Sequence, residues 1–352
     1  MNNGILFVLK RREDFDSKIH NVMGLSTGLF NSANYINEML LNNNISSNMV
    51  VVVDNNDIDR EVTKHKPKLV IIEALWVVPS KFTVLQKLHP NVTWIIRLHS
   101  DMPFMSNEGM AMDWLGDYSD NSNILIACNS PRMLNETRQY LKLRNNWTFE
   151  QTERKVIFLP NYYSPTFTQP KEFNYNKDYI DISCFGAVRP LKNHLLQAHA
   201  ALQFATDLGK KLKFHVNSGR IEMKGSPVVN NLRGLFQQIA HTGHELISHA
   251  WMQQSEFLAL CSTMDIGLQV SFSETFNIVA ADHISQGVPI IGSTEIPWLN
   301  IAYCANPVYT KDIVKKLHET YSDPLANVSN NQANLTKYLS YILLAWKQQL
   351  SI

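Results

Sequence analysis

Short apolar segments alternate with amphipathic segments along the first 160 residues. The apolar segments lie at residues 5–9, 49–53, 69–75, 94–98, 124–128 and 156–159. Continuous apolar runs of this length are typical of strands that are covered on both faces. Residues 32–41 have helical spacing instead, with apolar side chains on one face. Such alternation predicts a doubly wound parallel sheet that binds ligands at the carboxyl ends of its strands.

The same alternation returns after a polar, proline-containing stretch at residues 161–177, which we interpret as a linker. Strands are expected at residues 180–185, 212–217, 245–249, 265–270 and 288–291, and helices at 193–208, 255–262 and 277–286. A final amphipathic run at 334–350 is expected to pack on a domain surface as a terminal helix. The pattern therefore predicts two domains, residues 1–165 and 166–330, followed by a C-terminal helix at 331–352.

Composition narrows the class of protein. The chain has 352 residues, enough for two domains, and its 32 basic and 31 acidic side chains leave a net charge of +1. This balance excludes a strongly basic nucleic-acid coat protein and an acidic disordered tail. No apolar run approaches the roughly 20 residues that cross a bilayer, so we expect no membrane insertion. The four cysteines lack metal-ligand spacing, which favours reduced thiols, no metal site and a cytoplasmic location.

Two predicted strand ends in the first half carry candidate chemistry. The loop after the first strand contains glycines at 24 and 28, and Gly28 would let backbone amides approach an anion at the next helix. The spacing matches neither the dinucleotide fingerprint nor the P-loop, so a turn that faces donor or acceptor is the alternative. After the fourth strand, His99 would offer a neutral imidazole to a sugar hydroxyl. Alternatively, this loop only enters a helix that Asp101 caps.

Residues 273–292 are the most informative stretch. A turn presents Glu274, and a helix is expected to start near Phe276. The free amides of Phe276, Asn277 and Ile278 would form a positive pole. Asp282 follows Glu274 by eight residues, about two helical turns, which predicts both carboxylates on one face. This combination suits a sugar nucleotide, which carries hydroxyls and an anion, although a solvated helix face capped by Glu274 is the alternative.

The stretch resembles the signature of retaining glycosyltransferases of the GT-B fold, in a family-4-like branch, as SETF…D…QGVPII. The resemblance implies an α/β protein of two facing Rossmann-like domains with a cleft between them. It also implies a nucleotide-diphosphate sugar donor, UDP-linked, without any further cofactor. Glu274 would contact the donor-sugar hydroxyls, Asp282 (usually Glu) the ribose, and the amides of residues 276–278 the sugar or the phosphates.

Residues 185–193, FGAVRPLKN, resemble the same family's glycine-rich strand end. The resemblance implies that Gly186 permits close approach of the diphosphate. Arg189 would bind the diphosphate through bidentate hydrogen bonds, and Lys192 would bind it as a point charge. Alternatively, both cations are surface residues at a helix start. His99 falls where the family has a cleft histidine. The implied catalytic set is therefore Glu274, His99, Arg189 and Lys192, with no metal.

A narrower resemblance, over residues 24–33, 72–79 and 89–104, is to glycosyltransferases of tailed bacteriophages related to the T-even group. It implies a 5-hydroxymethylated pyrimidine in double-stranded phage DNA as acceptor, within the host cytoplasm. A basic rim beside two stacking aromatics would fit such an acceptor. Its members would be Lys10, Arg11, Arg12, Arg97, Arg132 and Arg138, with Trp76 and Phe104. Scattered solvated charges and core aromatics are the alternative interpretation of these residues.

Other functions remain open at this point. The acceptor could be a saccharide or another small or lipid molecule. A phosphorylase or epimerase of the same fold is a second class, although no lysine has a recognisable pyridoxal phosphate site. A catalytically inactive GT-B binding subunit is a third, favoured only by the aspartate at 282. The oligomeric state is open.

Overall fold

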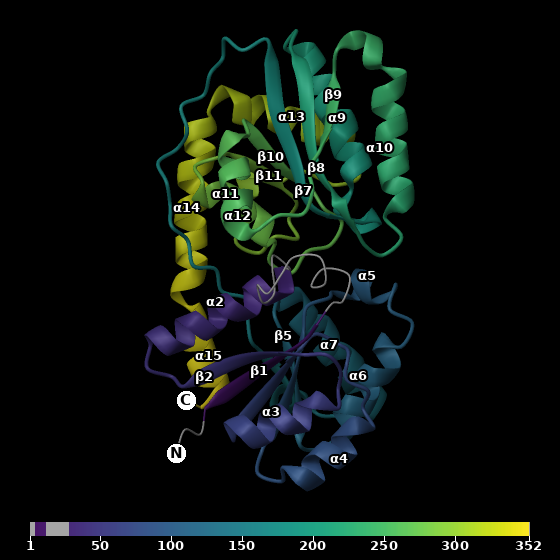
Figure 1. The fold of residues 1–352 in the computed structure, drawn as a ribbon, viewed down its shortest axis with the longest axis vertical. Coiled ribbons are helices and arrows are strands. Elements are labelled where there is room, and N and C mark those ends of the chain that lie inside the picture. Colours follow the sequence, from purple (N-terminus) through teal and green to yellow (C-terminus); the bar gives the residue numbers. More distant parts are fainter. Residues whose placement is uncertain (1–3, 12–27, 352) are drawn as a thin grey trace. The chain divides into compact units, whose positions relative to one another are not determined.

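The computed structural model describes residues 4–11 and 28–351, which divide into two units (Figure 1). Unit 1 comprises Met1–Ser164 and Leu339–Ile352, and unit 2 comprises Pro165–Tyr338. Each unit is built on one parallel sheet, six-stranded in unit 1 and five-stranded in unit 2. The predicted fold class is confirmed in this respect. None of the helices in the described ranges is both long enough and apolar enough to span a bilayer.

The sheet of unit 1 has the strand order β2-β1-β3-β4-β5-β6. Its strands are β1 (Ile5–Lys10), β2 (Ser47–Val52), β3 (Leu69–Glu73), β4 (Thr93–Leu98), β5 (Ile124–Cys128) and β6 (Val156–Phe158). Its helices are α2 (Gly28–Asn42), α3 (Asp57–His65), α4 (Lys81–Leu88), α5 (Met102–Met105), α6 (Ala111–Asp120), α7 (Pro131–Asn145), α8 (Phe149–Lys155) and α15 (Ile342–Leu350). Helices cover both faces, which explains the continuous apolar runs.

Alternation along β1 shows how the two faces are filled. Leu6 and Val8 are buried in a core cluster that also contains Phe82 of α4. Phe7 points to the opposite face, where its ring centroid lies 6.0 Å from that of Trp346 in α15. Burying one side chain of this size contributes about 1.5–3 kcal/mol. The C-terminal helix α15 is therefore an integral layer of unit 1.

The sheet of unit 2 has the order β11-β10-β7-β8-β9, so the order reverses between β7 and β10. The strands are β7 (Tyr179–Val188), β8 (Lys211–Ile221), β9 (Glu245–Ser248), β10 (Ile266–Gln269) and β11 (Ile290–Gly292). The helices are α9 (His194–Asp207), α10 (Ser226–Gln238), α11 (Gln254–Thr263), α12 (Ile278–Ser285), α13 (Thr310–Ser322) and α14 (Pro324–Ser340). Open sheets of this kind bind ligands where the strand order reverses.

The final amphipathic run is two helices rather than the single helix expected at 334–350. The helices α14 and α15 are divided at Tyr341. The two helices form hydrogen bonds with different units. Buried Asn327 of α14 accepts a hydrogen bond from the Ile290 amide of unit 2, at 3.0 Å. Trp346 of α15 donates to the carbonyl of Pro160 in unit 1, at 2.9 Å. The hydrophobic period alone does not reveal that successive turns pack on different sheets.

Candidate active site

The carboxyl end of β7, at the strand-order reversal of unit 2, is bent at Gly186. Its φ is +107°, a region that favours glycine. The ladder to β8 is irregular here, because Cys184 pairs with Val216 and Ala187 already with Asn217. The Gly186 amide donates instead to Oδ1 of Asn217, at 2.9 Å. A Cβ at this position would lie 3.7 Å from Val279, so the conformation rather than the space requires glycine.

Lys192 and Glu274, two predicted site residues, form an ion pair beside this bend. Nζ of Lys192 lies 2.5 Å from Oε1 of Glu274, and the two side chains are 9% and 6% exposed. Asn193 fixes the short helix Pro190–Lys192, because Nδ2 of its side chain donates to the carbonyls of Val270 and Pro307 at 3.1 and 2.8 Å. Removing either member of a buried pair leaves an uncompensated charge. The pair therefore holds the turn before α12 against the end of β7.

Helix α12 begins at Ile278, within two residues of the predicted start. Asn277 precedes it in the left-handed conformation, at φ +63°, and its Oδ1 accepts from the Ala280 amide at 2.9 Å. Its Nδ2 donates to Gln269, which in turn donates to the carbonyl of Phe185, each at 2.9 Å. Asparagine tolerates this conformation through such local bonds. The first-turn residue Ile278 is half-buried at this helix start.

The ring of Phe276, whose backbone amide is predicted to meet the donor, lies in the core of unit 2. Phe276 precedes α12, and its side chain is 1% exposed. Its ring packs against Trp298 and Tyr338, and its carbonyl accepts from Nε1 of Trp298 at 2.8 Å. Phe276 thus anchors the turn in the core of unit 2.

The predicted common helical face for Glu274 and Asp282 is wrong, because Glu274 precedes the helix. Asp282 lies on α12 with 3% exposure. Burial, and secondly the charge of Asp282, raise the pKa of Cys261 on the neighbouring α11. The two acids therefore occupy different surroundings.

Arg189 forms a second cationic group with residues that the sequence did not single out. Its Nη1 lies 3.5 Å from Oε2 of Glu222, and its side chain is 23% exposed. Glu222 also pairs with Arg220, whose guanidinium stands 4.6 Å from the ring centroid of Trp251. No motif marks Arg220, Glu222 or Trp251, since they come from the ends of β8 and β9. The two arginines therefore share the carboxylate of Glu222 at this strand end.

In unit 1, buried charges gather at the ends of β3 and β4. Glu73 and Arg97 are register partners, and both side chains are fully buried. Nη1 of Arg97 lies 3.2 and 3.0 Å from the two carboxylate oxygens, and Nε donates to the carbonyl of Leu159 at 3.0 Å. Nη2 donates to Asn161 at 2.5 Å, and the guanidinium lies 5.4 Å from the Trp346 ring centroid. The prediction that Arg97 belongs to an exposed basic rim is wrong.

His99 joins this cluster at the end of β4. Its Nε2 contacts Oε2 of Glu73, and Nδ1 lies 3.3 Å from Nδ2 of Asn129. The side chain is 14% exposed. Burial lowers the pKa of His99. The charge of Glu73 raises this pKa and the charge of Arg97 lowers it, and the net result is a pKa below the ordinary value. Burial would raise the pKa of Glu73, but Arg97 and His99 outweigh it and lower that pKa. The cluster is thus a neutral imidazole on a carboxylate that Arg97 neutralises.

The remaining predicted residues of unit 1 are dispersed. Gly28 is the first residue of α2 and is exposed, and a Cβ there would meet nothing within 4 Å. Residues 24–27 of the predicted anion loop, and Arg12 of the rim, lie outside the described residues. Lys10 and Arg11 are exposed. Structure gives no reason for glycine at position 28.

The other rim members have partners of their own. Arg132 pairs with Glu136 at 3.0 Å, and Arg138 pairs with Glu153 at 3.1 Å. Trp76 donates from Nε1 to the Glu73 carbonyl at 3.0 Å and packs against the core. Of the rim members that the structure describes, Lys10, Arg11 and Arg132 are exposed, Arg138 is half-buried and Arg97 is buried.

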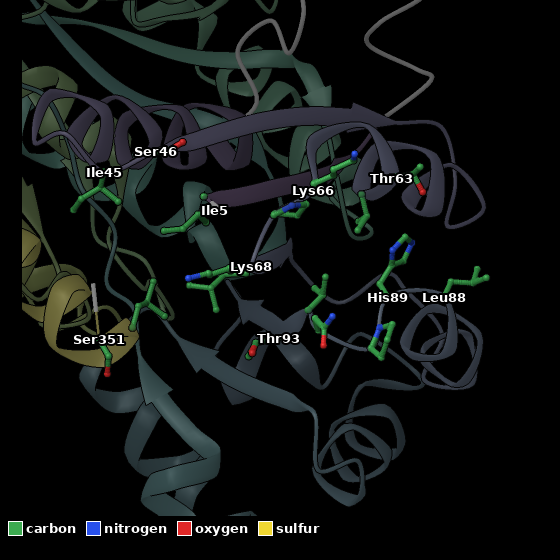
Figure 2. Close-up of a pocket in the computed structure, with 18 residues that line it drawn as sticks. Ile5, Ile45, Ser46, Thr63, Lys66, Lys68, Leu88, His89, Thr93 and Ser351 are labelled. Atoms are coloured by element: carbon green, nitrogen blue, oxygen red, sulfur yellow. The ribbon is translucent and has the colours of Figure 1, made fainter. Parts of the chain in front are cut away.

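A pocket of about 950 Å³ lies in unit 1 at the opposite, amino end of the sheet (Figure 2). Ile5, Leu69 and Thr93, the first residues of β1, β3 and β4, line it together with Lys66 and Lys68. It contains none of the predicted site residues. Within residues 4–11 and 28–351, no three His, Cys, Asp or Glu side chains are arranged to hold a metal ion.

The two parallel-sheet units, together with the similarity to solved structures, fit a GT-B fold. A UDP-forming trehalose-phosphate synthase from Burkholderia xenovorans superimposes with a TM-score of 0.68 at 12% identity, over 100% of this chain and 99% of that one. Sucrose-phosphate synthase from Thermosynechococcus elongatus superimposes with a TM-score of 0.63 at 12% identity, over 98% of this chain and 97% of that one. A trehalose-6-phosphate synthase studied for glycosyl transfer with retention superimposes with a TM-score of 0.63 at 11% identity, over 84% of this chain and 76% of that one.

At these identities the similarity establishes the fold. No protein-family model matches the sequence, and no curated protein matches it.

Proposed function

We propose that the chain is a retaining glycosyltransferase that uses a nucleotide-diphosphate sugar, UDP-linked, as donor. One observation carries the proposal: the bend at Gly186, the Lys192–Glu274 pair and the start of α12 meet where the strand order of unit 2 reverses. A diphosphate needs backbone amides and cations, and sugar hydroxyls need a carboxylate. The names of the similar structures, a UDP-forming synthase and a synthase that transfers with retention, support the same chemistry.

In the proposed reaction, the bond between the sugar C1 and the diphosphate oxygen breaks while the acceptor oxygen bonds to C1 on the same face. The acceptor proton passes to the leaving phosphate oxygen, and the nucleoside diphosphate departs. Arg189 and the helix start offset the charge that develops on the diphosphate. Glu274, held by Lys192, binds sugar hydroxyls. Asp282 contacts the ribose, and His99 contacts the sugar.

For the acceptor we propose a 5-hydroxymethylated pyrimidine in duplex DNA. The hydroxymethyl group projects from C5 into the major groove, where an enzyme reaches it without opening the duplex. The resemblance of residues 24–33, 72–79 and 89–104 supports this acceptor, and exposed Lys10 and Arg11 offer phosphate contacts. A saccharide acceptor is the alternative, favoured by the sugar-phosphate synthases among the similar structures.

The first experiment tests the donor. UDP-, ADP- and GDP-sugars are added singly to the full chain while the melting temperature is recorded. A ligand present at 100 times its Kd adds about 2.7 kcal/mol to the stability of the native state, a clear shift. Arg189→Ala should abolish the shift, and His241→Gln, at an exposed position of unit 2, should preserve it. A donor that binds without being hydrolysed or transferred would indicate an inactive binding subunit, and no shift with any donor would contradict the proposal.

The second experiment tests the acceptor with the donor that binds. Radiolabelled sugar is offered with hydroxymethylated duplex DNA, unmodified DNA, glucose 6-phosphate or free glucose. Transfer to the hydroxymethylated duplex should fall steeply between 50 and 200 mM salt, because phosphate contacts release counterions. The fall should be about tenfold for every few phosphate contacts that the protein makes. Arg11→Glu should weaken transfer to DNA and leave donor hydrolysis unchanged. Transfer to a sugar alone would assign a saccharide acceptor.

A further inference from the structure

We propose that Glu73 is a positioning residue for His99. Its carboxylate holds the ring as the Nε2–H tautomer, so that Nδ1 is the atom that accepts a hydrogen bond from a donor-sugar hydroxyl. The proposal rests on the transferase function proposed above and adds to it a residue to which the sequence motifs assigned no role.

The contacts of the ring define the tautomer. A carboxylate accepts hydrogen bonds only, so Nε2 of His99, in contact with Oε2 of Glu73, carries the hydrogen. Nη1 of Arg97 also lies 3.4 Å from Nε2, but it donates to the two Glu73 oxygens at the shorter distances of 3.2 and 3.0 Å. A neutral ring then has Nδ1 as an acceptor, which matches the approach of Nδ2 of Asn129 at 3.3 Å. This second contact is long for a hydrogen bond. A sugar hydroxyl replaces it at little cost, whereas Nε2 stays committed to Glu73.

The surroundings of Glu73 fix its carboxylate in turn. Arg97 approaches both oxygens, and Asn161 and the Leu159 carbonyl hold Arg97. Ser32 of α2 donates to the same Asn161 oxygen at 2.8 Å. An ion pair built only for stability needs no histidine, and apolar residues of the same volume often stabilise as well. The arrangement is that of a base oriented by a carboxylate, in which the partner of one ring nitrogen determines the state of the other.

Glu73→Gln tests the tautomer because Arg97 has only donors. The glutamine oxygen would turn to Arg97, and the amide NH₂ would face Nε2 of His99. The ring would then carry its hydrogen on Nδ1. In the full chain labelled with ¹⁵N-histidine, long-range ¹H–¹⁵N spectra report the tautomer, with His99 assigned from its absence in His99→Gln. Wild type should show Nε2–H, Glu73→Gln should show Nδ1–H, and Glu73→Asp should restore Nε2–H.

Ser32→Ala is the matched control, since it removes a hydrogen bond from the same network without touching the Glu73–His99 contact. It should leave the tautomer unchanged. A wild-type protein in which Nδ1 of His99 carries the hydrogen would overturn the proposal. This test uses the wild-type protein alone, so it stays valid even where Glu73→Gln does not fold. A Glu73→Gln protein that folds and keeps Nε2–H would also overturn it.

Steady-state kinetics separate this proposal from the transferase function. Glu73→Gln should lower kcat about 100-fold, as expected for a misoriented group, with donor KM within about threefold. Ser32→Ala should stay within about threefold in both. Normal turnover by Glu73→Gln would contradict the positioning role while the transferase function stands. A tautomer change as predicted, in a wild-type protein that transfers no sugar from any donor, would contradict the function while the Glu73–His99 contact stands.

Discussion

The carboxyl ends of the two sheets hold different kinds of site on the same architecture. In unit 1, Glu73 and Arg97 are fully buried and neutralise each other, and the Glu73 carboxylate contacts the side chain of His99. In unit 2, a bent strand end, a helix start and the half-buried Arg189 lie around one ion pair. Under the proposed function, the first arrangement orients one group, and the second binds an anion through backbone amides and Arg189. The difference predicts that nucleotide binding depends on unit 2 and sugar chemistry on both.

The largest effect is expected from breaking the Lys192–Glu274 pair. Lys192→Met or Glu274→Gln should each lower the free energy of unfolding by about 3–5 kcal/mol, because a buried charge is left unpaired. The double variant should lose less than the sum of the two. Urea unfolding of the four proteins gives the coupling energy. Additive losses would mean that the pair does not hold the turn before α12.

The next effect separates the units by function. Arg189→Ala should lower turnover by roughly 30- to 1000-fold, or about 2–4 kcal/mol, and should weaken nucleotide binding. His99→Ala should lower turnover while nucleotide affinity stays nearly unchanged. Titration calorimetry with the nucleotide measures both affinities. Equal losses of affinity in the two variants would break the division between the units.

Acid should destabilise unit 2 through its buried histidines. Burial, and secondly the charges of Lys192 and Arg189, lower the pKa of His194 to about 3. Burial lowers the pKa of His283 to about 4. Both stay neutral in the folded state, while the unfolded chain takes up protons below about pH 6.5, so stability falls as the pH falls through that value. At pH 5.5 each should contribute a loss of about 1.4 kcal/mol relative to high pH.

Urea unfolding at pH 7.5 and 5.5 checks this loss. Replacing His283 by Asn should remove its share of the pH dependence, whereas His241→Gln, at an exposed position, should leave the dependence as it is. Equal pH dependence in all three proteins would contradict the account.

Two glycines give the smallest effect. Gly186→Ala should lower the free energy of unfolding by about 1 kcal/mol, since alanine resists a positive φ. Gly28→Ala should change it by less than about 0.5 kcal/mol, because its Cβ meets no neighbour. Thermal unfolding ranks the two variants. A larger loss at Gly28 would reveal a constraint that the helix start of α2 does not show.

The sequence predicted the sheets well, because a strand covered on both faces must be apolar throughout. It predicted the Lys192–Glu274 neighbourhood through motifs, but not Asn217 or Gln269, whose amide side chains act on backbone groups and leave no pattern. Arg97 was misplaced because arginine is mostly exposed in proteins. A signal was present: opposite charges stand at the ends of two apolar runs, Glu73 in one and Arg97 in the other. Parallel pairing brings such ends together.

The start of α12 shows the second limit. The helix was expected to start near Phe276, but the left-handed Asn277 separates that residue from it. Phe276 is held by Trp298, 22 residues later. A contact so distant in sequence decides the boundary.

Hydrogen exchange with and without UDP tests the central claim, that the nucleotide binds where the strand order of unit 2 reverses. UDP at saturating concentration should slow exchange in residues 186–193 and 274–280. It should leave the amino-end pocket of unit 1, around Lys66 and Lys68, unchanged. Protection confined to that pocket, or no protection in unit 2 with UDP, ADP or GDP, would contradict the account.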